Sequence, residues 1–359
     1  MAELKISSRM KKILTALFLI FGILFILSVN LSPADNFKYG VSFSRFHADE
    51  LGLDWKETYL AILNDLGVKN FRFSAHWPLT EPEKDKYNFS ELDFQITEAQ
   101  KNGASVILAV GRRLPGWPEC HEPGWLNNQQ STPVPEQSTV RGTATNNQQE
   151  INKQKQERIL KYIETVINRY KNYDNIIYWQ VENEPFLTGF SRSACGSLDK
   201  EFLDKEIAFV RELDPSRKIV ITDSGEFGTW FQAYSRADVF GTSLYLYVWP
   251  RSVGFSLRYP ITPAFFRIKQ NLVRLFSGVK PSFVIELSTE PWLLQPIIET
   301  PIEVQLDRMG LDKFNEMIDF SAKTGFNGFY LWGAEWWYWL KLQEYPDHWE
   351  RAKELFNVQ

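Results

Sequence analysis

Two glutamates, each at the end of an apolar segment, are the residues best suited to chemistry. Glu184 lies in an Asn-Glu-Pro motif at 183–185, and Glu286 lies in an Ile-Glu-Leu segment at 285–287. A carboxylate at the end of a buried strand is costly unless it is solvated, paired or used. Hydrolysis of a glycosidic bond needs one acid to protonate the leaving oxygen and one carboxylate to attack or to activate water. The two glutamates are therefore a candidate catalytic pair.

Two further glutamates are alternatives to this pair. Glu290, in a Ser-Thr-Glu-Pro-Trp segment at 288–292, competes with Glu286 for the role of nucleophile. We favour Glu286 because it is nearer the strand end, where position is held most rigidly. Glu182 is close to Glu184, and we interpret it as strand-internal or paired with an arginine.

Aromatic residues are abundant enough to suggest a sugar-binding surface. The chain has 13 Trp and 15% aromatic residues, and flat apolar rings suit stacking on sugars. Trp117 and Trp292 lie in expected loops, as do Trp125 and Trp249, and roughly half of these four are expected to line a cleft. The three tryptophans at 336, 337 and 339 are as compatible with core packing as with binding.

The elements that must position these residues follow a repeating strand–helix pattern. Eight short apolar, β-rich runs alternate with stretches that carry apolar residues at helical spacing, which predicts a single (β/α)8 barrel. A doubly wound open sheet is the alternative, but no Gly-rich phosphate turn follows the first run. The predicted strands are 39–44, 70–76, 105–111, 176–182, 218–223, 239–244, 282–287 and 325–332. The main predicted helices are 55–66, 89–101, 150–170, 203–213, 263–276 and 304–323.

Long segments after the strands indicate where an active site is built. Barrel enzymes place catalytic groups on the loops at the C-terminal ends of their strands. Residues 112–149 are polar and too long for an ordinary turn, so we expect a loop, with low-complexity sequence from 129 onward. Its first part contains Arg112, Arg113 and His121, which are weaker candidates for contact with a sugar.

By motif and position, residues 36–340 resemble clan A of the retaining glycoside hydrolases, which includes the family 5, family 10 and family 39 types. The resemblance implies that Glu184 is the general acid/base and that Asn183 holds the substrate 2-hydroxyl. It implies that Glu286 is the nucleophile and that Arg72, in Phe-Arg-Phe, contacts it. Two aromatic residues also match by position: Tyr245, with Tyr247 as its alternative, resembles the tyrosine after strand six, and Trp332 resembles the tryptophan that floors the sugar site.

A retaining mechanism on a β-linked oligosaccharide or polysaccharide is what this resemblance implies. No metal and no organic cofactor is expected. β-Glucan, β-mannan, β-xylan and β-galactoside are not separable from these residues. One departure is Ser243, where many relatives carry Asn before the strand-six tyrosine. A non-catalytic, membrane-anchored sugar-binding barrel is the rival hypothesis.

The charge and the cysteine content limit which binding partners, metals and disulfides are expected. The formal net charge is -4, which gives no basic field for nucleic acid. A carbohydrate substrate and a monomeric chain are expected. Four scattered His and two Cys show no zinc spacing. The two cysteines, Cys120 and Cys195, fall in loops at the same end of the predicted barrel, which favours a disulfide between them.

The N-terminal segment predicts export. Four basic residues, the last of which is Lys12, precede an uncharged apolar run at 13–31. This length favours an uncleaved membrane anchor over a removable signal peptide, and the basic flank places the catalytic part outside the cytoplasm. We therefore expect an N-terminal segment 1–35 and a catalytic domain 36–359.

If residues 13–31 anchor the protein, the full-length chain should sediment with membranes and resist carbonate extraction, because the apolar segment would remain in lipid. Fractionation followed by N-terminal sequencing tests this. A soluble mature protein that begins near Asp35 would show instead that the segment is a cleaved signal and that the protein is secreted.

Overall fold

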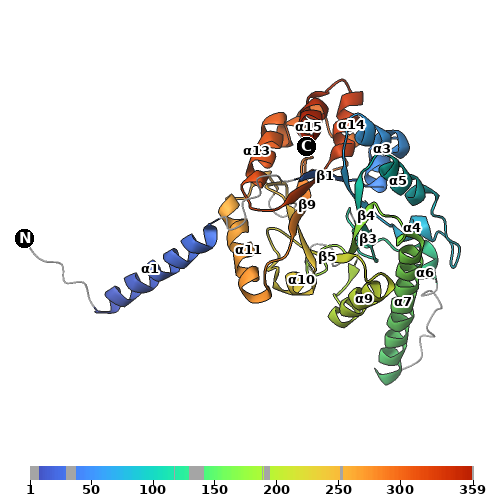
Figure 1. Ribbon diagram of the computed structural model, residues 1–359, viewed down its shortest axis with the longest axis horizontal. Helices are drawn as coiled ribbons and strands as arrows, with labels where there is room; N and C mark the ends of the chain where they lie inside the picture. Colours follow the sequence, from blue (N-terminus) through green and yellow to red (C-terminus); the bar gives the residue numbers. More distant parts are fainter. Residues whose placement is uncertain are drawn as a thin grey trace, which may run out of the picture.

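A closed barrel of eight parallel strands forms the centre of the computed structural model (Figure 1). The structure describes residues 8–29, 38–116, 118–128, 141–187, 189, 195–250 and 254–357. The strands follow one another around the barrel in the order β1-β10-β9-β6-β5-β4-β3-β2. The predicted barrel is thus confirmed, and the open-sheet alternative is wrong. The barrel strands are β1 (Lys38–Ser42), β2 (Asn70–Ser74), β3 (Ser105–Val110), β4 (Ile176–Val181), β5 (Lys218–Asp223), β6 (Val239–Leu244), β9 (Ser282–Ser288) and β10 (Gly328–Trp332).

The strands are buried on both faces because helices cover the outside and side chains fill the inside. In β3 every residue from Val106 to Val110 is buried, which explains why the strand is a continuous apolar run. A layer of five buried side chains from alternate positions fills the barrel interior. The layer consists of Ile107, Val220, Val239, Ile285 and Tyr330.

The helices that surround the barrel arise where apolar residues recur at helical spacing and a polar residue caps the start. The side chain of Asp54 accepts hydrogen bonds from the backbone N–H groups of Lys56 and Glu57, which fixes the beginning of α3. Asp199 caps α9 in the same way through the N–H of Phe202. The main outer helices are α3 (Trp55–Asn64), α5 (Ser90–Lys101), α7 (Arg141–Tyr170), α9 (Lys200–Leu213), α10 (Phe231–Arg236), α11 (Pro263–Ser277), α13 (Leu311–Ala322) and α15 (Asp347–Asn357).

Two sequence predictions about the helices are wrong in extent. Residues 141–149, predicted as part of a loop, belong to α7, which begins at Arg141 rather than at residue 150. The predicted helix 304–323 is two helices, α12 (Ile302–Arg308) and α13, and Gly310 is the residue that precedes α13. Glycine lowers helix stability by about 1 kcal/mol relative to alanine, which makes it a suitable residue for this break.

The segments at the C-terminal ends of the strands contain structure that the sequence did not indicate. α6 (Gly124–Asn128) lies within the predicted loop 112–149. After β6, the strands β7 (Tyr247–Val248) and β8 (Leu257–Arg258) pair antiparallel outside the barrel. Tyr247 belongs to this outer pair, so the two tyrosines weighed for one role lie in different elements.

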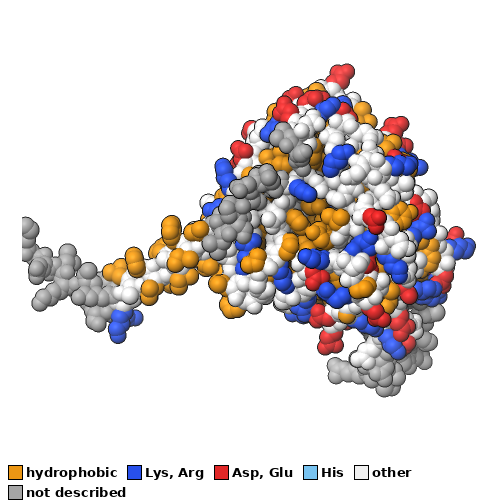
Figure 2. Space-filling view, viewed as in Figure 1, with side chains coloured by type: hydrophobic (Ala, Val, Ile, Leu, Met, Phe, Trp, Pro, Cys, Tyr) orange, Lys and Arg blue, Asp and Glu red, His pale blue; other side chains and the backbone are white. Residues whose placement is uncertain are grey.

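The N-terminal helix α1 (Ser8–Ser28) projects away from the barrel (Figure 1). Its apolar side chains are exposed along its length, whereas acidic and basic groups are interspersed over the barrel (Figure 2). The helix meets α11, where Arg267 Nε donates to the carbonyl of Ser28 at 2.6 Å. Among the residues that the structure describes, no helix combines the length and the apolarity that a membrane span requires. The anchor at 13–31 is therefore not confirmed and stays a prediction.

Candidate active site

Glu184 lies immediately beyond β4 in a strained backbone conformation. Its φ is 41°, in the left-handed region that residues other than glycine rarely occupy. Its backbone N–H donates to Thr222 Oγ1 on β5 at 2.7 Å. The side chain is buried, and its Oε1 has no hydrogen-bond partner within the described part of the chain. The fold therefore holds this carboxyl group rigidly and leaves one of its oxygens available to a ligand.

Glu286 lies on β9 and is paired with a buried arginine. Arg72, on β2, donates from Nη1 to Glu286 Oε1 at 2.7 Å and is only 1% exposed. The hydroxyl of Tyr245 lies 3.2 Å from Glu286 Oε2, with the hydroxyl as donor. A guanidinium and a phenol therefore both donate to this one carboxyl group. The arrangement suits a carboxylate nucleophile.

The acid groups of the site have different environments. Burial raises the pKa of Glu184 well above its ordinary value, and the neighbouring charge of Glu286 raises it further, with a smaller contribution from Glu119. The pKa of Tyr245 is also raised well above its usual range, first by burial and then by the charges of Glu286 and Glu184. Tyr245 is thus a hydrogen-bond donor to Glu286 rather than a phenolate. The buried Glu184 and the arginine-bound Glu286 thus lie in contrasting environments.

Asn183 is oriented by the same arginine. Arg72 Nη2 donates to Asn183 Oδ1 at 2.7 Å, and the Thr222 hydroxyl lies 3.3 Å from the same oxygen. Arg72 Nε donates to Gln180 Oε1 at 2.8 Å. Because Oδ1 faces these donors, the Nδ2 amino group of Asn183 points the other way. An amide held in this orientation presents a donor to a sugar hydroxyl.

The predicted tryptophans occupy different positions. Trp332 lies at the end of β10 and is partly exposed, and its indole Nε1 donates to Glu290 Oε1 at 2.7 Å. The ring of Trp292 packs edge-on against Tyr245, with the centroids 5.6 Å apart. Trp332 therefore contacts Glu290 directly, and Trp292 packs against the tyrosine that donates to Glu286. Trp117 lies outside the described residues.

Glu290, the alternative nucleophile, is bound differently from Glu286. Its Oε1 accepts the hydrogen bond from Trp332, and its Oε2 lies 2.6 Å from His47 Nε2. It has no contact with Arg72 among the hydrogen bonds and ion pairs of the described residues. The two carboxylates therefore have separate partners, and only Glu286 has those expected of the nucleophile.

Comparison with known proteins identifies a family and a relative whose sequences are similar to part of this chain. The glycoside hydrolase family 42 model, described as β-galactosidase, matches residues 53–213. Endo-1,4-β-xylanase 3 of Hypocrea jecorina is 29% identical over 180 residues, which is 49% of this chain and 44% of the xylanase. These similarities fit clan A of the glycoside hydrolases.

Solved clan A structures share the fold. The family 5 mannosidase from Rhizomucor miehei superposes with a TM-score of 0.51 at 17% identity, covering 82% of this chain and 80% of the mannosidase. Xylanase 10B from Thermotoga maritima gives 0.50 at 14% identity, covering 84% and 86%. The chain spans less than half the length of the curated xylanase that it matches. The matched region 53–213 contains Glu184 but not Glu286, so the second glutamate rests on the geometry of this barrel.

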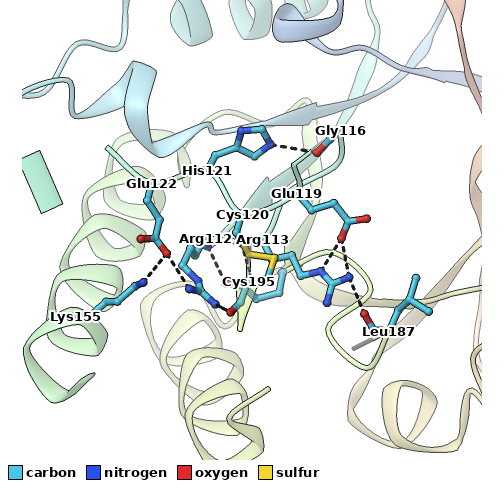
Figure 3. The surroundings of a disulfide bond; sticks show 11 residues. Arg112, Arg113, Gly116, Glu119, Cys120, His121, Glu122, Lys155, Leu187 and Cys195 are labelled. Carbon is cyan, nitrogen blue, oxygen red and sulfur yellow. Dashed lines mark hydrogen bonds and ion pairs between the residues drawn. A yellow bond between two sulfur atoms is a disulfide. The ribbon is translucent and has the colours of Figure 1, made fainter. Parts of the chain in front are cut away.

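A disulfide joins the loops that follow β3 and β4. Cys120 and Cys195 are bonded, with their Cα atoms 5.3 Å apart, as predicted. Figure 3 shows Arg112 and Arg113 beside the bridge, with their guanidinium groups directed to opposite sides. Arg112 contacts Glu122 and the carbonyl of Cys195, whereas Arg113 contacts Glu119 and the carbonyl of Leu187. These two weaker candidates for sugar contact are thus engaged in holding the loops after β3 and β4.

Sequence reasoning missed a buried carboxyl pair behind Glu184. The two side-chain oxygens of Glu182 each accept a backbone N–H at 2.7 Å, one from Arg112 and one from Arg113. Burial and the adjacent Glu182 raise the pKa of Glu206, on α9, well above its ordinary value. The bonds from Arg112 and Arg113 to Glu182 hold the loop after β3 against the end of β4. The only signal in the sequence was an acid two residues before the Asn-Glu-Pro glutamate.

Sequence reasoning also passed over His47 and Glu119. His47 follows β1 and contacts Glu290, and Glu119, at a φ of 69°, pairs with Arg113 and faces Glu184 electrostatically. Neither residue belongs to a recognisable motif. The described residues contain no group of three or more His, Cys, Asp or Glu side chains arranged to hold a metal ion.

Replacing both Cys120 and Cys195 with serine should lower the free energy of unfolding and slow turnover. The bridge closes a loop of 75 residues, which contributes about 4 kcal/mol in the chain-entropy model. Urea denaturation measures the first effect. Turnover should fall because Arg113 and Glu119 would no longer be held beside Glu184. Reduced wild type is the matched control and should show the same loss; an unchanged midpoint in both samples would contradict the structural role of the bridge.

Proposed function

We propose that this protein is a retaining β-glycosidase that hydrolyses O-glycosidic bonds by double displacement, with Glu184 as acid/base and Glu286 as nucleophile. The observation that carries the proposal is the contrast between the two carboxyl groups. Glu286 receives donors from Arg72 and Tyr245, while Glu184 is buried with a raised pKa. A buried carboxyl group with a raised pKa, close to a second carboxyl group that an arginine and a tyrosine bind, suits the pairing of an acid with a nucleophile.

In the first step, Glu184 donates its proton to the leaving oxygen as Glu286 attacks the anomeric carbon. The glycosidic C–O bond breaks, and a glycosyl ester forms on Glu286. Formation of this ester removes the negative charge on Glu286, which lowers the pKa of Glu184. Glu184, now ionised, takes a proton from water as the water attacks the anomeric carbon. The ester breaks, and the sugar is released with its original anomeric configuration.

The neighbouring residues supply binding and orientation. Asn183, held at its oxygen by Arg72, directs its amino group toward the sugar 2-hydroxyl. Trp332 and Trp292 provide apolar faces for sugar rings. The site around these residues has more carboxyl groups than cations, which favours a neutral sugar over a uronic acid. The named relatives include a xylanase, a mannosidase and a β-galactosidase, so xylan, mannan and galactoside substrates, together with β-glucan, form the first assay panel.

The location of the site is also a proposal. Disulfides persist in oxidising compartments, and the Cys120–Cys195 bridge therefore supports an extracytoplasmic barrel. Residues 1–35 would direct export, either as an anchor or as a cleaved signal. We propose that the protein is a monomer, because the proposed catalytic residues all come from one barrel. The non-catalytic sugar-binding alternative would give no reason for Glu184 and Glu286 to have such different environments.

Glu286→Gln should reduce turnover by about 10⁴-fold or more, because the nucleophile is lost. Glu184→Gln should spare the first step for aryl glycosides with good leaving groups and slow the second step by ~10²–10⁴-fold. Azide should rescue Glu184→Ala as a β-glycosyl azide and Glu286→Ala as an α-glycosyl azide. NMR of the products assigns the anomers. If Glu290→Gln loses activity while Glu286→Gln keeps it, the nucleophile is misassigned, and an inverted product would reject the retaining mechanism.

The pKa of Glu184 should fall when the charge of residue 286 is removed. In the wild type, burial and the charge of Glu286 raise it, and kcat/KM should therefore decline as pH rises and Glu184 loses its proton. Glutamate ¹³C-carboxyl NMR titration of wild type and Glu286→Gln measures the change directly. Glu316→Gln, on α13, is the control and should leave the Glu184 titration unchanged. Identical Glu184 pKa values in wild type and Glu286→Gln would show that the two groups do not interact.

A further inference from the structure

Trp332 is held by more contacts than a simple binding platform requires. Its carbonyl accepts hydrogen bonds from both the N–H and the hydroxyl of Thr289, at 2.9 and 2.7 Å. Its indole N–H donates to Glu290, the next residue of that segment. The backbone and the side chain of Trp332 are therefore both fixed by the segment that follows β9, the strand of Glu286.

His47 completes this arrangement from the other side. Its ring lies nearly parallel to that of Trp332, with 5.9 Å between the centroids and 23° between the planes. Its Nε2 lies 2.6 Å from Glu290 Oε2. The same imidazole thus packs against the indole face and binds the carboxylate that holds the indole N–H. His47, Glu290 and Trp332 therefore each contact the other two. They lie after β1, after β9 and at the end of β10, respectively.

The charges of the surrounding groups keep this set together at neutral pH. Burial opposes a charge on His47, but Glu290 and, more weakly, Glu50 and Glu335 outweigh it and raise the pKa of His47 well above its ordinary value. The imidazolium can therefore pair with the Glu290 carboxylate. The side chains of His47 and Glu290 are only 9% and 14% exposed, so the pair is shielded from screening by water and salt.

The backbone next to Trp332 is closely packed against the segment that holds Glu290. Gly333 has a φ of 120°, and a Cβ there would lie 2.7 Å from Glu290 Cβ, so a larger residue would displace Glu290. On the loop after β3, Gly116 lies beside the Trp332 ring at van der Waals distance. A buried ion pair is rarely favourable for stability alone, since apolar residues often replace it without loss.

We propose that His47 and Glu290 are positioning residues that fix the indole plane of Trp332 at the floor of the sugar site. The inference rests on the proposed function, because it takes Trp332 as the surface on which the sugar stacks. A ring held at one tilt offers the bound sugar a surface that is already oriented, which favours binding. Neither His47 nor Glu290 needs to touch the reacting atoms. Their loss should weaken binding of the sugar more than it slows the chemical step.

A double-mutant cycle on the full-length protein tests this, using the aryl β-glycoside that wild type cleaves best. Glu290→Gln and His47→Phe should each raise KM by about tenfold, the loss typical of a hydrogen bond to a charged group, with kcat changed by less than about threefold. In a Trp332→Phe background, which has no indole N–H, Glu290→Gln should raise KM by less than about twofold, because the residue through which it acts is altered.

The matched controls separate positioning from folding. His348→Phe, in α15, removes another buried imidazole, and Glu316→Gln, in α13, removes another bound carboxylate. Both should leave KM at the wild-type value even if the melting temperature falls. Three results would overturn the proposal: an equal effect of Glu290→Gln in both backgrounds, an unchanged KM in Glu290→Gln and His47→Phe, or loss of turnover by more than about 10³-fold in Glu290→Gln. The last result would identify Glu290 as the nucleophile.

Failure of the proposed function can be recognised separately. If wild type hydrolyses no glycoside of the panel and binds no released sugar by titration calorimetry, the glycosidase proposal fails. The positioning of Trp332 is then judged from its indole ¹H–¹⁵N resonance, identified by its loss in Trp332→Phe. That resonance should move in Glu290→Gln and in His47→Phe and stay in place in both controls. An unmoved resonance would overturn the positioning role as well.

Discussion

The buried guanidinium of Arg72 is the interaction on which the rest of the site depends. It lies inside the barrel and donates to Glu286 on β9, to Gln180 on β4 and to Asn183 just beyond β4. Removing a charged group from water costs several kcal/mol, and the penalty is offset only when the geometry and the remaining donors are satisfied. The Glu286 carboxylate and the amide oxygens meet this condition. Arg72 therefore fixes the side chains of Glu286 and Asn183 at the same time.

The position of Glu184 depends in turn on strained backbone that other contacts maintain. Glu182 and Glu184 both have positive φ, at 57° and 41°, and such residues cost ~1–3 kcal/mol each. Glu182 offsets part of this cost by accepting the backbone N–H groups of Arg112 and Arg113, and the N–H of Asn183 donates to the carbonyl of Arg113 at 2.7 Å. The chain beyond β4 is thus held against the loop after β3, the same loop that the disulfide ties down. The strained backbone at Glu182 and Glu184 is therefore maintained by the same loop that the disulfide restrains.

The sequence was most informative where a pattern repeats or where a residue ends a strand. Eight apolar runs separated by helical spacing predicted the barrel because both periodicities follow directly from backbone geometry. The same reasoning placed Glu184 and Glu286 at one mouth, since parallel strands end on one side, whereas the contact of Arg72 with Glu286 was implied by the family resemblance. Cys120 and Cys195 were predicted to pair for that reason too.

Contacts that depend on loops were not accessible from the sequence. The pairing of His47 with Glu290 joins segments 243 residues apart, and neither residue belongs to a periodic pattern. Glu182 was interpreted as strand-internal or arginine-bound, but its partners are backbone N–H groups, which every residue type carries. The start of α7 was misplaced because residues 141–149 are polar and give no apolar stripe on which a helix prediction could rest. In each case the deciding interaction comes from the fold rather than from residue type.

Ser243, the departure from the clan pattern, illustrates how a local difference fits the same chemistry. Its hydroxyl accepts the backbone N–H of Gly225 at 3.1 Å, and a Cβ at Gly225 would lie 2.0 Å from the carbonyl of Ser243. The loop after β5 therefore passes directly over β6, where a short side chain at 243 fits. The same hydroxyl also hydrogen-bonds to Glu184, which opposes the rise in its pKa. Because burial and the charge of Glu286 outweigh this single bond, the serine moderates the rise in the pKa of Glu184 without reversing it.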